Sequence, residues 1–131
     1  MFTQLRTSKA NKEVVSKLTR RLNLGAENII ARIAFSYSIS KDRKLELKNI
    51  LDSGGKEYSK NVLFGEKIDT YLGILCCHYG LYRTDDNIPK YVKMHIDDGL
   101  LLLDEELQER SNVDGFEFLV EKLNISLSQI K

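Results

Sequence analysis

The segment GAENIIARIAFSYSI, residues 25–39, predicts a helix that is apolar on nearly every side. Residues four apart share a face of a helix, so Ile29 and Ile33 lie together while Ala31 and Phe35 lie on another face. A helix of this kind needs neighbours all round. The segment therefore predicts either the central helix of a monomeric bundle or a core shared between copies of the chain.

The segment before this helix is basic. Phe2–Thr7 alternates weakly and predicts a short strand, Ser8 is a candidate N-cap, and residues 9–23 predict an amphipathic helix. Gly25 stands where a left-handed residue would end that helix. The apolar stripe of the predicted helix at residues 9–23 consists of Val14, Val15, Leu18 and Leu22. The cations in and just before this helix, with Glu13 as the one acidic residue among them, are Arg6, Lys9, Lys12, Lys17, Arg20 and Arg21.

The two halves of the chain carry opposite charge. Residues 1–60 hold 13 Lys and Arg against 6 Asp and Glu, whereas residues 61–131 hold 7 against 13. A basic half favours a polyanionic partner, and an acidic half favours a solvated surface or a protein partner.

The length of 131 residues predicts one domain, 1–131, that can bury its own core. The first residues resemble no signal peptide, and no stretch reaches the roughly 18 apolar residues that span a bilayer, so we expect a cytoplasmic protein without a membrane partner. Cys76 and Cys77 are adjacent and are expected to be buried, free thiols.

The second half of the chain predicts further helices. The turn Asp52-Ser53-Gly54-Gly55 predicts a hairpin between the segment after residue 40 and residues 56–62, although residues 41–49 fit a helix as well as a strand. A helix is expected from Glu66 to Gly80, another from Pro89 to about Gln108 with a bend or break at Gly99, and a last one over residues 116–123.

Candidate chemical sites are weak. Cys76, Cys77, His78 and His95 lack the paired spacing of a zinc site. His95-Ile96-Asp97-Asp98 predicts a solvated turn of helix, with a metal-dependent nickase using Asp97 and Asp98 as an alternative. We expect no catalytic residue, no bound metal and no cofactor. The turn before Lys56 presents this lysine, and with it Lys60, as additional phosphate contacts.

The order of a short strand, a basic helix and an apolar helix is that of ribbon-helix-helix DNA-binding proteins, in which two chains pair their strands and lysines hold phosphates. The fold class predicted is mainly α, with a ribbon-helix-helix-like N-terminal unit, additional helices and an oligomeric state.

The chain also resembles the DndE family of DNA sulfur modification proteins. The resemblance rests on the order and spacing of several short segments between Phe2 and about Leu103: Arg6-Thr7-Ser8, residues 28–34, Gly54-Gly55-Lys56-Glu57-Tyr58, Leu63-Phe64-Gly65-Glu66, residues 71–75 and residues 95–100. It implies a ribbon-helix-helix-like, tetrameric DNA-binding subunit with a preference for nicked duplex, whose partner subunits supply the desulfurase, iron–sulfur and ATPase functions.

These observations predict a DNA-binding accessory subunit that holds duplex DNA through its phosphates for the DNA phosphorothioate modification system. The phosphate contacts expected are Arg6, Lys9, Lys12, Lys17, Arg20, Arg21, Lys56 and Lys60. The partners expected are DNA, other subunits of that system and further copies of the chain. A ribbon-helix-helix transcriptional regulator is the alternative from a neighbouring class.

Overall fold

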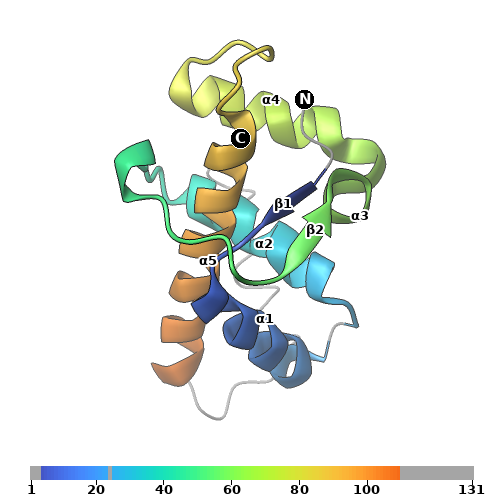
Figure 1. The fold of residues 1–131 in the computed structure, drawn as a ribbon. Helices are drawn as coiled ribbons and strands as arrows, with labels where there is room; N and C mark the ends of the chain where they lie inside the picture. Colours follow the sequence, from blue (N-terminus) through green and yellow to red (C-terminus); the bar gives the residue numbers. More distant parts are fainter. Residues whose placement is uncertain (1–3, 24, 110–131) are drawn as a thin grey trace.

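The computed structural model describes residues 4–23 and 25–109, and these residues form a helical bundle with one short two-stranded sheet (Figure 1). The predicted helix at residues 116–123 lies outside this range. In chain order the elements are β1 (Gln4–Arg6), α1 (Lys9–Leu22), α2 (Glu27–Ser40), η1 (Leu47–Asn49), β2 (Glu57–Ser59), α3 (Lys60–Phe64), η2 (Gly65–Lys67), α4 (Ile68–Tyr79) and α5 (Ile88–Glu109).

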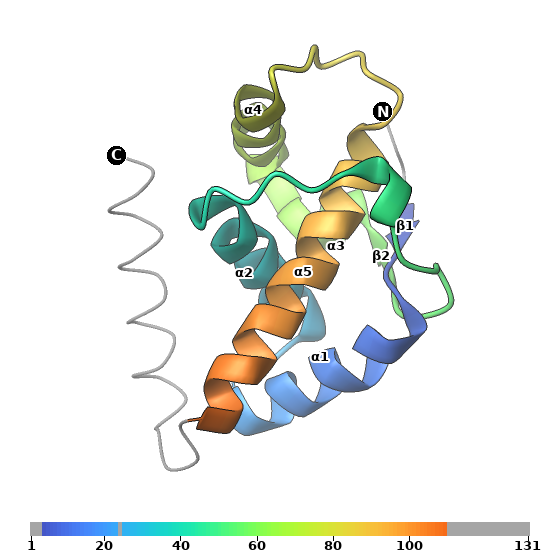
Figure 2. The same ribbon diagram turned by 90° about the vertical axis from the view of Figure 1, so that its left-hand side faces the viewer.

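The helix predicted at residues 25–39 is α2, and it lies at the centre of the bundle. It packs most extensively against α5 and also contacts α1, α3 and α4 of the same chain. α5 runs the length of the molecule, with α1 beside its C-terminal half and α4 near its N-terminal end (Figure 2). One chain therefore supplies the neighbours that the apolar faces of α2 require.

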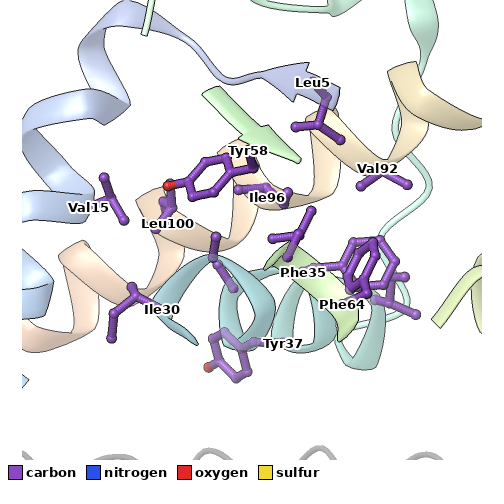
Figure 3. Packing of buried hydrophobic residues seen from close by; sticks show 14 of the residues in the cluster. Leu5, Val15, Ile30, Phe35, Tyr37, Tyr58, Phe64, Val92, Ile96 and Leu100 are labelled. Atoms are coloured by element: carbon purple, nitrogen blue, oxygen red, sulfur yellow. The ribbon is translucent and has the colours of Figure 1, made fainter. Parts of the chain in front are cut away.

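The core is built around aromatic and aliphatic side chains of α2 and α5. Phe35 and Phe64 meet edge to face with ring centroids 5.1 Å apart, close to Val92 (Figure 3). Ile96 and Leu100 of α5 are fully buried. Arg32, the only cation within α2, donates from Nε to the Leu63 carbonyl oxygen at 2.6 Å and so binds the end of α3.

Gly99 is a point at which α5 lies directly against the backbone of α2. A Cβ atom at this position would lie 1.9 Å from the Ala34 carbonyl oxygen. α5 continues from Ile88 to Glu109 through this residue, so the helix does not break at Gly99, which was one of the two predicted outcomes. The absence of a side chain at Gly99 instead allows α5 to pack directly against the backbone of α2.

The predicted hairpin is also wrong. β2 pairs antiparallel with β1, with Leu5 opposite Tyr58, and the residues between Lys41 and Lys56 contain only the short η1. Leu5 and Tyr58 are both buried, so this pairing places one apolar side chain of each strand in the core. Both strands belong to one chain, and the two-chain ribbon stays a prediction.

The ends of the helices largely follow the sequence. Ser8 caps α1 as predicted, and α4 ends at the predicted Gly80, which adopts the left-handed conformation. α1 ends on a left-handed Asn23, with φ 52°, two residues before Gly25. Among residues 4–23 and 25–109, no helix combines the length and apolar character needed to cross a membrane.

Candidate nucleic-acid interface

The outer face of α1 carries the exposed cations predicted to contact phosphates. Val15, Leu18 and Leu22 are buried against the core, which turns Lys9, Lys12 and Arg20 to solvent. Within the part of the chain that the structure describes, these three cations take part in no ion pair. Arg20 lies eleven positions after Lys9, so the row is about 16 Å long.

The N-terminus of α1 is held by side chains from three parts of the chain. Ser8 N donates to Asp97 Oδ1 at 3.0 Å, Lys9 N donates to Asp52 Oδ2 at 2.9 Å, and Asn11 N donates to Ser8 Oγ at 3.4 Å. The N–H groups of Lys9 and Gly54 lower the pKa of Asp52. These three backbone donors are therefore already used by the protein, so the exposed side chains of α1 are the better candidates for contacting a phosphate.

The glycine turn packs against the start of α1. Gly55 N donates to the Thr7 carbonyl oxygen at 3.0 Å, and a Cβ atom on Gly55 would lie 2.2 Å from the Ser8 carbonyl oxygen. The turn thereby brings Lys56 beside α1, and its role as a second phosphate contact stays a prediction. Lys56 Nζ lies 3.8 Å from Glu27 Oε1, and Ser16 of α1 donates to the same carboxylate at 3.4 Å.

Other predicted contacts are paired with carboxylates. Lys17 Nζ lies 2.6 Å from Asp104 Oδ1 of α5, and Arg6 Nε lies 3.4 Å from Glu57 Oε1 across the sheet. Arg21 is exposed near the end of α1, and Lys60 is half-buried at the start of α3. The structure thus places Lys56 beside the helix that carries Lys9, Lys12 and Arg20. Lys17 instead connects α1 to α5.

Asp97 is a buried structural residue, so the prediction of a solvated turn at residues 95–98 is wrong. Its side chain is 3% exposed, accepts from Lys93 Nζ at 2.7 Å and accepts from Asn11 Nδ2 at 2.7 Å, in addition to Ser8 N. The Lys93–Asp97 pair at i, i+4 was visible in the sequence, but its burial was not. The carboxylate joins α5 to α1.

Asp98 is likewise occupied by protein groups. Arg43 donates to it from Nε at 2.7 Å and from Nη2 at 2.9 Å, and Ser38 Oγ donates at 2.6 Å. Both carboxylates of the nickase alternative therefore have cationic partners. Among the residues that the structure describes, no three His, Cys, Asp or Glu side chains are grouped to hold a metal ion.

His95 is buried in a chain of hydrogen bonds that also includes Ser38 and Asp98. Because Ser38 gives its proton to Asp98, His95 Nδ1–H must donate to Ser38 Oγ, 2.8 Å away. His95 Nε2 then accepts from the Tyr79 hydroxyl at 2.6 Å. Burial, reinforced by His78, lowers the pKa of His95 to about 4.

This histidine should make stability depend on pH. The folded-state pKa of about 4 lies below the ordinary value of 6.5, so the unfolded chain takes up a proton more readily. The contribution is fully present above pH 6.5 and is lost as the pH falls towards 4, by about 3 kcal/mol in total. Urea unfolding across this range should show the loss in the wild type and not in His95→Gln, and equal pH slopes in both would contradict the assignment.

The cysteines fulfil only half of the prediction. Cys76 is buried, and burial raises the pKa of its thiol, whereas Cys77 is exposed. Neighbouring residues of a helix point about 100° apart, and at this place α4 turns Cys76 towards the core and Cys77 away from it. Both thiols are free.

Comparisons with known proteins match most of the chain. A family described as DNA sulphur modification protein DndE matches residues 4–111. The crystal structure of DndE from Escherichia coli B7A, involved in DNA phosphorothioation modification, is similar with a TM-score of 0.63 and 21% identity, over 79% of this chain and 98% of that chain. At this identity the likeness shows the fold alone. No curated protein matches the sequence.

Proposed function

This chain belongs to the DndE family of DNA sulphur modification proteins, and from that premise we propose that it is a DNA-binding accessory subunit of the DNA phosphorothioate modification system. It holds duplex DNA, including nicked duplex, by its phosphates while other subunits insert the sulfur. The observation that carries this proposal is the exposed row of Lys9, Lys12 and Arg20 on α1, which has no carboxylate partner within the described residues.

The chemistry of this surface suits phosphates better than bases. Lysine is a compact point charge on a flexible stem, and it binds phosphate oxygens without reading a base edge. Apolar side chains that could insert between bases are lacking on the exposed surface of α1, which consists of Lys9, Ala10, Lys12, Glu13, Arg20 and Arg21. Binding should therefore tolerate most sequences.

The assembly proposed is a homotetramer that works in the cytoplasm beside the other subunits of the system. Its support is the family membership together with the resemblance described above. Sedimentation velocity at micromolar concentration tests it, and a monomer under those conditions would contradict it.

Replacing Lys12 or Arg20 by alanine should weaken binding to all duplexes alike. Each phosphate contact releases about 0.9 counterion, so each variant should reduce the slope of log affinity against log salt by about one unit. Fluorescence anisotropy with intact, nicked and single-stranded oligonucleotides over a salt series measures both quantities.

Two variants serve as controls. Lys90→Ala removes an exposed charge at the start of α5, away from α1, and should leave the slope unchanged. Lys17→Ala should have a smaller effect than Lys12→Ala, because Lys17 is already paired with Asp104. Equal losses in all four variants would locate the binding surface elsewhere.

The same binding assays distinguish the alternative functions. Selection of one sequence would indicate a transcriptional regulator, and metal-dependent conversion of intact DNA would indicate a nickase.

A further inference from the structure

Two carboxylates line a cleft beside the basic face of α1. The cleft has a volume of about 280 Å³ and lies between the start of α2 and β2, with Glu27, Lys56, Glu57, Tyr58 and Val62 among its walls. Each carboxylate faces a predicted phosphate contact. Glu27 Oε1 lies 3.8 Å from Lys56 Nζ, and Glu57 Oε1 lies 3.4 Å from Arg6 Nε.

The nitrogen–oxygen distances in these two ion pairs are longer than those in the ion pairs of Asp97 and Asp98. Charge-assisted hydrogen bonds of good geometry span about 2.7–2.9 Å, as in Lys93–Asp97 and Arg43–Asp98, both at 2.7 Å. The side chains of Lys56 and Glu27 are 41% and 30% exposed, and those of Arg6 and Glu57 are 54% and 40% exposed. Exposed pairs of this kind contribute little to stability, so their geometry is easily exchanged for another.

Glu27 lies where α1 and Lys56 meet. It is the first residue of α2, and its second carboxylate oxygen accepts from Ser16 Oγ of α1 at 3.4 Å. A negatively charged group is thus held between the basic helix and the lysine of the glycine turn. A phosphate that contacted both would need the same position.

We propose that Glu27, supported by Glu57, is an internal counter-ion that occupies this position until a DNA phosphate replaces it. The proposal rests on the proposed function, because it concerns regulation of the same surface. A Lys56–Glu27 pair carries no net charge, so it releases no counterion from DNA until the pair separates. The carboxylate then remains nearby and repels the phosphate, which lowers affinity and flattens its salt dependence.

Glu27→Gln and Glu57→Gln test this directly. Each should tighten binding to duplex DNA by about two- to fivefold, the range expected for an exposed ion pair, and Glu27→Gln should steepen the salt slope by up to about one unit. Glu105→Gln is the matched control, because it removes the same charge from an exposed residue of α5 that has no ion pair in the described part of the chain. An equal gain in Glu105→Gln would overturn the proposal.

A double-mutant cycle separates exchange at Lys56 from a general change in charge. Glu27→Gln should give no further gain in a Lys56→Ala background, whereas the same gain in both backgrounds would overturn the proposal. If Lys12→Ala and Arg20→Ala weaken binding while the cycle shows no coupling, the counter-ion inference alone fails. If the wild-type protein binds no duplex, both the counter-ion inference and the proposed function fail.

Discussion

Replacing Gly99 by alanine should destabilise the protein by about 3 kcal/mol or more, at or beyond the upper end of ordinary overpacking. The added Cβ would lie 1.9 Å from the Ala34 oxygen and 2.4 Å from its carbonyl carbon. Both contacts are with backbone, so no side chain can move aside. α2 and α5 would have to separate along their whole crossing, and urea unfolding followed by circular dichroism measures the loss.

The control is the same substitution at Gly73 of α4. A Cβ atom there would meet nothing within 4 Å, so Gly73→Ala should stabilise by up to about 1 kcal/mol through the better helix propensity of alanine. Opposite signs at the two glycines are the expected result. A Gly99→Ala variant as stable as the wild type would show that α2 and α5 can move apart freely.

Asp97→Asn is expected to cost about 3–5 kcal/mol, because it leaves the buried ammonium of Lys93 without its counter-charge. The side chains of Lys93 and Asp97 are only 6% and 3% exposed. Asparagine keeps an oxygen for Ser8 N, so most of the loss reports on the charge. Urea unfolding again provides the free energy.

The Lys93→Met/Asp97→Asn double variant tests that reasoning. It removes both charges, so its destabilisation should be well below the sum of the two single variants. Additive losses would mean that the two charges do not interact and that the variants act through packing alone.

Most helices could be predicted because their signals are local. The apolar stripe and Ser8 predicted α1, Gly80 predicted the end of α4, and the all-round apolar character of residues 25–39 predicted a central α2. In each case the residues that decide the structure lie within one or two helical turns of one another.

What the sequence could not supply are contacts between distant segments. β1 and β2 are separated by some fifty residues, and the turn signal at Gly54 and Gly55 favoured a local hairpin over this pairing. Gly99 was interpreted as a helix breaker because nothing in the sequence shows that Ala34 approaches it. A glycine that permits close packing and a glycine that ends a helix are the same letter.

In the candidate site, too, local features could be predicted from the sequence and contacts with distant segments could not. The amphipathic pattern correctly predicted that Lys9, Lys12 and Arg20 face solvent. The carboxylates that engage the other cations come from α2, β2 and α5, so no spacing within residues 6–21 could reveal them. Asp52 and Asp97, which hold the start of α1, were missed for this reason.

The anchoring of α1 by Ser8, Asp52 and Asp97 also affects the entropy and heat capacity with which α1 would bind a polyanion. The backbone of the helix is already fixed to α5 and to the glycine turn, so ordering on binding is confined to the rotamers of lysine and arginine side chains. The exposed face of α1 also offers little apolar surface to bury. Binding through this face would therefore be driven by released salt ions and accompanied by only a small change in heat capacity.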